Sequence, residues 1–326
     1  RFMLYLQSSM KKPTISPKAI ILSTVFLDVV GIGLIVPVLP LYVESFGVSH
    51  NVVTALFAVF ALCAFLSSPI LGVISDRKGR RPVLLVSLAS SAVGWLIFAF
   101  SHSIVGLFIG RIIDGSAAGN ISTAQNYLID IAKDEKERAQ NLGLIGAIFG
   151  VAFIIGPLVG GLLSNLYKPL PFILVGLLAV INTILAYFFL PETHHHRNPE
   201  KMSWNPFAPL VKALKSKTML ALYLSWFLFG VAISVNQSIF SLYVKDSFGW
   251  GVIGAGLVMT LVGVIVSLNQ AVLIKKFWLK YFKPAILNLW LLLPFAIGYV
   301  VMALPYRWMF ILGLIITAFG QSVYRV

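Results

Sequence analysis

The chain alternates long apolar runs with short polar connections that carry most of its charged residues. Each run is about 20 residues long, enough for an α-helix to cross the roughly 30 Å hydrocarbon core of a bilayer. Strands of a membrane barrel show short alternating segments instead, so this pattern predicts helices. The expected spans of this all-α membrane protein are 20–43, 52–75, 83–100, 104–129, 139–163, 171–190, 219–244, 252–274, 284–304 and 308–326.

Basic residues gather in every second connection between the apolar runs. Most of the 25 Lys and Arg residues lie in segments 1–18, 77–81, 133–138, 197–217 and 275–283. Because cytoplasmic loops of membrane proteins are enriched in Lys and Arg, this asymmetry predicts a cytoplasmic N-terminus. We expect a multi-pass protein of the plasma membrane, the inner membrane of a bacterium, with its basic side chains against anionic lipid headgroups.

The overall composition narrows the class of protein further. Hydrophobic residues make up 59% of the chain and charged residues 11%, with a mean hydropathy of +0.92. That leaves too little polar material for the surface of a soluble domain. The net charge of +14 belongs to loops that flank spans and not to a separate basic domain, so no nucleic-acid partner is expected. A single cysteine, Cys63, excludes a disulfide framework and a thiolate metal cluster.

The longest polar connection, 191–217, divides the spans into six and four. We expect it to be a cytoplasmic linker between a six-helix lobe at 18–190 and a second lobe at 218–326. Two six-helix lobes are typical of a two-lobed transporter, so the second lobe, with four of an expected six spans, is predicted to be incomplete. The N-terminal tail is expected at 1–17, with 1–9 non-native because a plausible Met-Lys-Lys start follows them.

The connection between the second and third spans reads Gly72-Val-Ile-Ser-Asp-Arg-Lys-Gly-Arg-Arg-Pro82. Gly79 permits a turn with positive φ, and Pro82 suits the first turn of a helix, where no amide donor is needed. We predict that Asp76 and the neighbouring cations form a cytoplasmic ion-pair latch that holds one conformation closed. A basic loop that only sets topology is the simpler alternative, but it does not require this spacing. The predicted gate-loop residues are Gly72, Asp76, Arg77, Gly79, Arg80 and Arg81.

This spacing resembles the loop signature of the major facilitator superfamily, and every key position matches. The first span, with Leu27-Asp-Val-Val-Gly-Ile-Gly-Leu-Ile-Val-Pro-Val-Leu-Pro40, resembles the first helix of drug:proton antiporters related to tetracycline efflux proteins. The resemblance covers about residues 18–190 and implies a two-lobed helical bundle. The loop at 275–283 lacks the Gly and Asp of the signature, so a second latch there is not expected.

The fifth span is similar to the helix motif that separates antiporters of this superfamily from symporters. Small residues spaced by four also let membrane helices pack closely, and close packing without a transport role is the alternative interpretation. The residues of this motif are Gly146, Gly150, Gly156, Pro157, Gly160 and Gly161.

Three charged residues lie within the apolar runs of the first lobe. Asp28 is well inside the first span, and such ionisable groups face the bundle interior and mark ion or substrate pathways. Arg111 and Asp114 are one turn apart in the fourth span and share a face. We predict that Arg111 competes with a proton for Asp114 or Asp28, so that protonation and substrate binding exclude each other. A structural hydrogen bond of Asp28 and a static Arg111–Asp114 ion pair are the alternatives.

Polar and small residues extend the faces that carry these charges. No acid lies within the four expected spans of the second lobe, so that lobe contributes only neutral candidates. An aromatic side chain there suits a flat lipophilic compound. The predicted substrate pocket consists of Thr24, Gly31, Ile35, Ser122, Gln125, Asn236, Gln237 and Phe240.

The residues and the resemblance together imply a secondary active transporter. It is expected to export a lipophilic or amphipathic small molecule, drug-like or tetracycline-like, in exchange for protons by alternating access. The sequence has no Gly-x-x-x-x-Gly-Lys-Ser/Thr loop for ATP and no nucleophile–base pair or metal cluster, so neither enzyme activity nor a cofactor is expected. The expected partners are the substrate, protons and membrane lipids, and the protein is expected to be a monomer. The alternatives are an uptake symporter for a sugar or metabolite and a non-transporting membrane fragment.

Overall fold

The computed structural model describes residues 16–193, 205, 207, 211, 214–282 and 284–324. Within these ranges all regular structure is helical. Eight helices, counting 104–130 as one, are long and apolar enough to cross a membrane, and two shorter apolar helices follow them. The prediction of an all-α membrane protein is therefore confirmed. The predicted tail at 1–15 and most of the linker at 194–213 lie outside the described residues.

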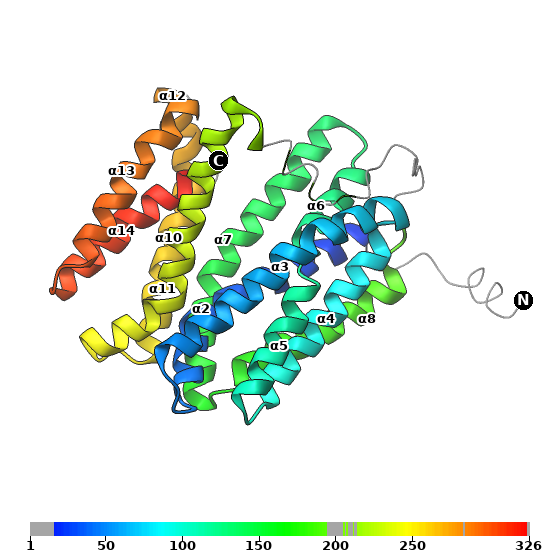
Figure 1. The fold of residues 1–326 in the computed structure, drawn as a ribbon. Helices are drawn as coiled ribbons and strands as arrows, with labels where there is room; N and C mark the ends of the chain where they lie inside the picture. Colours follow the sequence, from blue (N-terminus) through cyan, green and yellow to red (C-terminus); the bar gives the residue numbers. More distant parts are fainter. Residues whose placement is uncertain are drawn as a thin grey trace, which may run out of the picture.

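The helices form two groups, which we call the first and second lobes. The first lobe contains α2 (Pro17–Glu44), α3 (His50–Lys78), α4 (Arg80–Phe100), α5 (Ile104–Ser116), α6 (Asn120–Asp130), α7 (Glu135–Leu166) and α8 (Leu170–Phe189). The second lobe contains α10 (Lys217–Phe248), α11 (Val252–Leu268), a π-helix (Asn269–Trp278), α12 (Leu279–Tyr281), α13 (Pro284–Met302) and α14 (Arg307–Tyr324). In Figure 1 the orange and red helices lie on one side of α7 and the cyan helices on the other.

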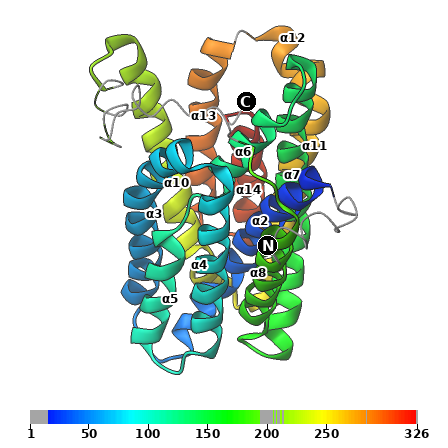
Figure 2. The same ribbon diagram turned by 90° about the vertical axis from the view of Figure 1, so that its right-hand side faces the viewer.

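Each lobe has its own apolar core. In the first lobe, the rings of Tyr42, Phe98 and Phe172 pack together, with centroids 4.9–5.8 Å apart. In the second lobe, Phe240 and Phe310 stack within a separate buried cluster. α2 lies at the centre of the first lobe, and most of its apolar residues are buried. In Figure 2 it is seen behind α4 and α8. Its central position brings the residues of the first span into the interior.

The predicted fourth span is confirmed as Ile104–Asp130, but it is not one continuous helix, because the chain leaves the helix between α5 and α6. Glycine disfavours a helix interior, and the sequence Gly-Ser-Ala-Ala-Gly begins at Gly115. A Cβ on Gly115 would lie 2.8 Å from the carbonyl oxygen of Phe60, so α3 packs directly on this turn. Ser67 and Ser68 of α3 donate hydrogen bonds to the carbonyls of Gly115 (2.9 Å) and Ala118 (2.8 Å). These hydroxyls satisfy backbone groups at the break, as an apolar bundle requires.

The predicted eighth span also differs, because α11 ends at Leu268 and ten residues of π-helix follow. Asn269 opens this segment, and its amide donates hydrogen bonds to the Ser322 hydroxyl (2.6 Å) and the Phe319 carbonyl (3.3 Å). Its oxygen accepts a hydrogen bond from the indole of Trp278 (2.8 Å). A buried amide with three partners thus stabilises the π-helix against α14. The other spans agree with the described helices to within about four residues at each end.

Glycines of α7 place its backbone directly against the neighbouring helices on both sides. Toward α2, a Cβ on Gly156 would lie 2.9 Å from the Cα of Gly33, and one on Gly160 would lie 2.8 Å from the carbonyl oxygen of Leu34. Toward α11, a Cβ on Gly161 would lie 3.1 Å from a carbonyl oxygen. We call this strip of close contacts the glycine seam. It joins the two lobes, since α2 belongs to the first and α11 to the second.

The remaining motif residues of α7 do not all share this role. Gly150 faces the hydroxyl of Ser267 in α11 at 3.0 Å, whereas Gly146 has no neighbouring atom within 4 Å. The carbonyl of Pro157 contacts Gly256, where a Cβ would lie 2.5 Å from it. Only part of the predicted motif therefore depends on glycine for space.

We expect Gly160→Ala to destabilise the protein, because its methyl group meets backbone, and Gly146→Ala to leave stability unchanged or raise it slightly, because alanine favours a helix interior and meets no neighbouring atom. The cost of forcing a methyl group into such a contact is about 1–3 kcal/mol. Thermal unfolding of the detergent-solubilised variants, followed by loss of the monodisperse species, measures the difference. Equal unfolding temperatures for the two variants would contradict the tight seam.

Candidate functional site

A cavity of about 750 Å³ is lined by residues of both lobes. Its wall comes from α2, α3, α4, α5, α6 and α8 of the first lobe and from α10 of the second. The lining is mostly apolar and includes the aromatic side chains Phe57, Phe60 and Trp95. A cavity of this size and character is typical of a small-molecule site. Its ionisable lining residues, within the described part of the chain, are Asp28, Arg111 and Asp114.

Asp28 lies in the middle of α2 and faces this cavity. Its Oδ1 accepts a hydrogen bond of 3.3 Å from the amide of Asn120, the first residue of α6. Its Oδ2 is buried and has no hydrogen-bond partner among the described residues. None of the ion pairs found in those residues includes Asp28. The cavity wall therefore holds a carboxylate that lacks a cation.

Arg111 and Asp114 share a face, as their spacing predicted, and form the ion pair that the sequence left as an alternative, with 3.7 Å between Nη1 and Oδ2. Both side chains are buried, with 5% and 9% of their surface exposed. The second oxygen of Asp114 accepts a hydrogen bond of 2.8 Å from the hydroxyl of Ser91 in α4. The carboxylate of Asp114 is thus held by two partners, whereas that of Asp28 is held by one.

Aromatic rings surround the guanidinium group of Arg111. Their centroids lie 4.8–5.9 Å from its Cζ atom, close enough for cation–π attraction. The rings belong to Phe57, Phe60, Trp95 and Phe98. Sequence reasoning missed this arrangement, and it also missed Asn120 and Ser91, because the contacts join residues of different spans.

The structure brings most of the predicted pocket residues together. Five of them line the large cavity, namely Gly31, Ile35, Ser122, Gln125 and Gln237. Asn236 instead lines a smaller pocket between the lobes, which Gln237 also borders.

Two predicted pocket residues, Thr24 and Phe240, lie outside both linings, which corrects the sequence-based assignment. Thr24 is buried behind the wall, where its hydroxyl accepts a hydrogen bond of 2.8 Å from Asn182 of α8. Phe240 points into the core of the second lobe and stacks on Phe310. Helical spacing placed Thr24 on the same face of the first span as Asp28. It did not show that α8 would cover this position.

The predicted gate loop forms a charged cluster at the end of the bundle that carries the basic connections, which we call the basic end. Gly79 has a φ of 112°, as the turn requires, and Arg80 begins α4. The guanidinium of Arg80 forms ion pairs with Asp76 and with Asp130 of α6, the latter at 3.1 Å. Glu192, which follows α8, accepts a hydrogen bond of 2.9 Å from the backbone amide of Arg80. These contacts join α3, α4 and α6 within the first lobe.

The remaining predicted gate residues are placed around this cluster. Arg81 donates a hydrogen bond of 2.6 Å to the carbonyl of Tyr187 in α8. Arg77 lies in the last turn of α3, and Gly72 lies inside that helix with no neighbour within 4 Å of its position. Gly72 is therefore part of a helix and not of the loop.

At the opposite end of the bundle, an ion pair links the two lobes. Nζ of Lys245 in α10 lies 2.7 Å from both carboxylate oxygens of Glu44, the last residue of α2. His50 lies 3.8 Å from the same carboxylate. One turn deeper, Ser241 donates a hydrogen bond of 3.3 Å to the carbonyl of Val36. The lobes are therefore held together at the end opposite the basic cluster.

These features define the class of protein: a multi-pass membrane protein with an apolar cavity between two lobes and charged residues inside its spans. A family model described as Major Facilitator Superfamily matches residues 21–326. The chain belongs to this superfamily of transporters.

Several relatives of the chain are drug-resistance proteins. The chain is 35% identical over 257 residues to the tetracycline resistance protein, class C, of Escherichia coli, a match covering 77% of this chain and 65% of that protein. It is 31% identical over 266 residues to the class B protein of Escherichia coli, covering 78% and 65%. It is 27% identical over 288 residues to the quinolone resistance protein NorA of Staphylococcus aureus, covering 84% and 72%.

Solved structures of transporters share the fold. The human organic anion transporter MFSD10 superposes with a TM-score of 0.69 at 22% identity, covering 94% of this chain and 83% of that chain. The nucleoside transporter NupG superposes with a TM-score of 0.73 at 15% identity, covering 95% and 80%. At these identities the likeness shows a common architecture alone, and it confirms the predicted superfamily-like helical bundle.

The lobe-linking ion pair predicts the effect of reversing its charges. We expect Glu44→Lys to open this end, because it places two cations together, and Glu44→Lys with Lys245→Glu to close it again. Labelling of a Ser234→Cys reporter in the cavity wall, in a Cys63→Ser background, measures the opening with an impermeant maleimide. Since exposed pairs contribute about 0.2–1 kcal/mol, labelling should quicken about 1.4- to fivefold in the single variant.

Lys168 supplies the control, because it is exposed at the same end and has no ion pair among the described residues. Lys168→Glu should leave the labelling rate unchanged. A double reversal that labels as fast as the single one would show that the pair does not hold this end closed.

Proposed function

We propose that this protein exports lipophilic or amphipathic small molecules from the cell in exchange for protons. The observation that carries this proposal is the state of Asp28, a carboxylate in the wall of the cavity that has, among the described residues, one buried oxygen without a hydrogen-bond partner and no ion pair. Buried charged side chains are retained in membrane spans where they are paired with another group or where they take part in the function of the protein.

The chemistry of exchange follows from this incomplete pairing. A proton satisfies the free oxygen of Asp28, and so does a polar or cationic group of a substrate in the cavity. The two occupants exclude each other, so arrival of one favours release of the other. Arg111 and Asp114 lie in the same wall of the cavity. Their ion pair, with the aromatic rings around it, provides a second pair of charges that can take part in the exchange.

The character of the cavity supports a lipophilic substrate. Its lining is mostly apolar, with three aromatic rings in reach of a ligand, and such surfaces bind flat amphipathic molecules mainly by burial. The relatives whose names record resistance to tetracycline and to quinolones support a drug-like compound.

Alternating access requires that the cavity open at one end at a time. The ion pair between Glu44 and Lys245 supports closure at the end opposite the basic cluster. With the N-terminus in the cytoplasm, as the charge pattern predicts, this end faces outward. We propose that the described conformation is the one in which substrate enters from the cytoplasm.

Transport in membrane vesicles tests the proposal, with the protein expressed from its complete gene. In everted vesicles, an imposed proton gradient should drive tetracycline into the lumen, and a protonophore should abolish this uptake. We expect Asp28→Asn to abolish proton-driven uptake and to retain tetracycline binding, because the amide cannot exchange a proton. Asp28→Glu should restore part of the uptake.

The matched control is Asp246→Asn, at an exposed acid near the end of α10. Full proton-driven uptake in Asp28→Asn would overturn the coupling role of this residue. Uptake that a protonophore leaves intact would exclude proton exchange. Depletion of tetracycline from the everted vesicles would favour an uptake symporter.

A further inference from the structure

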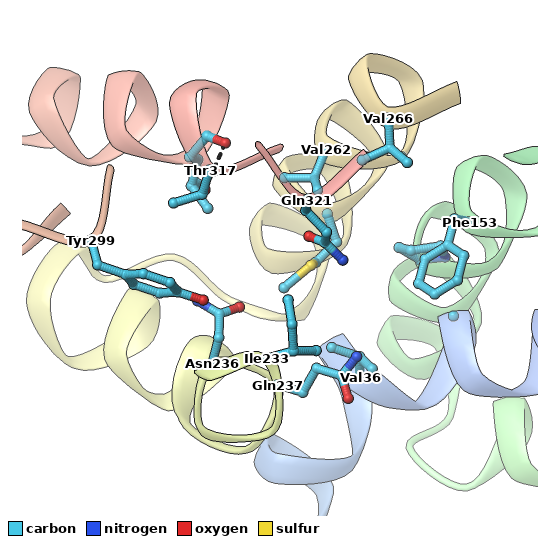
Figure 3. Close-up of a pocket in the computed structure, with 15 residues that line it drawn as sticks. Val36, Phe153, Ile233, Asn236, Gln237, Val262, Val266, Tyr299, Thr317 and Gln321 are labelled. Carbon is cyan, nitrogen blue, oxygen red and sulfur yellow. Dashed lines mark hydrogen bonds between the residues drawn. The ribbon is translucent and has the colours of Figure 1, made fainter. Parts of the chain in front are cut away.

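A smaller pocket of about 60 Å³ lies on the second-lobe side of the large cavity, lined by α2, α7, α10, α11, α13 and α14. It is close to neutral, because its polar lining residues, within the described part of the chain, are amides and hydroxyls. They are Asn236, Gln237, Tyr299, Thr317 and Gln321. In Figure 3 the ring of Tyr299 points toward Asn236, and Gln321 extends into the space between the helices.

The two hydroxyls of this pocket are already occupied by backbone partners. Thr317 donates a hydrogen bond of 2.9 Å to the carbonyl of Leu314, within its own helix. Tyr299 donates one of 3.4 Å to the carbonyl of Ala232 in α10. Each hydroxyl therefore has only acceptor capacity left for a ligand.

The three amides are different, because none of them forms a side-chain hydrogen bond with another described residue. Each amide carries two donor hydrogens and an acceptor oxygen. An amide that loses water without gaining a partner is unfavourable by about 1–3 kcal/mol. Three such groups around one apolar pocket form a surface that gains from a ligand with its own donors and acceptors. We call Asn236, Gln237 and Gln321 the amide triad.

The amide triad adjoins the charged wall of the large cavity. Gln237 and Val36 line both spaces, so one molecule of drug size can occupy the cavity and reach the pocket. The two halves differ in chemistry, since the first lobe offers Asp28 and the Arg111–Asp114 pair whereas the second offers neutral amides. A ligand that spans both halves is therefore recognised through charge at one end and through hydrogen bonds at the other.

We propose that the amide triad is a binding subsite for the uncharged polar part of the substrate, bearing hydroxyl, carbonyl or carboxamide groups. This inference rests on the proposed export function and names the chemistry that selects its substrates. Aliphatic or aromatic ligands without such groups leave the amides unsatisfied and gain nothing from this subsite. The triad thus sets which lipophilic compounds bind, and the charged wall sets the exchange with protons.

Two transported probes separate these roles. Tetracycline carries hydroxyl, carbonyl and carboxamide groups, whereas tetraphenylphosphonium is a lipophilic cation without a hydrogen-bonding group. The test variant is Asn236→Leu with Gln321→Met, which keeps side-chain volume and removes two amides. We expect the KM for tetracycline to rise about five- to 150-fold, as loss of two hydrogen bonds implies. The KM for tetraphenylphosphonium and the protonophore sensitivity of both fluxes should not change.

The control is Gln140→Met, which replaces an exposed amide in α7, remote from both linings. Binding to purified protein, measured by quenching of tryptophan fluorescence, gives a second readout that needs no transport. Weaker binding of tetracycline alone supports the subsite even if vesicle uptake fails, and that failure then counts against the export function only. Equal weakening of both probes, or of neither, overturns the subsite.

Discussion

Polar groups inside this bundle depend on protein partners, because the surrounding hydrocarbon offers none. The first lobe meets this constraint closely around α5 and α6. Serines of α3 take the carbonyls at the break between these helices, and Arg111 lies among four rings beside Asp114. A few buried polar atoms of the described residues, such as Nε of Arg111 and Oδ1 of Asn120, have no hydrogen-bond partner, and Oδ2 of Asp28 is the carboxylate oxygen among them. The break itself contributes to the site, because it places Asn120 at the start of α6, within hydrogen-bond distance of Asp28.

The contacts between the lobes differ in kind along the length of α7. In the glycine seam, backbones meet without long side chains between them, which permits small rotations without unlocking interdigitated side chains. At the end of α2 the link is ionic, and the side chains of Glu44 and Lys245 are 24% and 45% exposed. Exposed ion pairs contribute only about 0–1 kcal/mol, so this link breaks at little cost while the seam remains packed. The arrangement suits two lobes that rock about a shared strip.

Much of the fold could be predicted from the sequence, because apolar runs of membrane-spanning length leave few alternatives. The shared face of Arg111 and Asp114 and the positive φ of Gly79 were also predictable, since each depends on residues close together in the chain. The contacts between spans that are distant in the sequence could not be predicted. The aromatic rings around Arg111 belong to α3 and α4, whose register against α5 no local pattern fixes.

The errors at Thr24 and Phe240 have the same origin. Thr24 lies on the helix face that the sequence assigned to the pocket, and Phe240 was assigned to the pocket as an aromatic side chain, but a neighbouring helix covers each of them. The break before α6 left a local signal in the run of small residues that begins at Gly115. That signal is ambiguous, because small residues serve close packing in a continuous helix equally well.

The two sides of the binding region place different demands on the chain. In the proposed exchange, Asp28 binds and releases a proton only while its carboxylate has an oxygen without a hydrogen-bond partner. Few substitutions in the cavity wall around Asp28 preserve that condition. A neutral amide has no such restriction, and its replacement changes a hydrogen bond without adding or removing charge in the bundle. Because the charged residues lie on α2 and α5 and the amide triad on α10 and α14, separate helices carry the two demands. Under the proposed division of roles, substitutions in the second lobe change the substrate range without altering the charged residues of the first lobe.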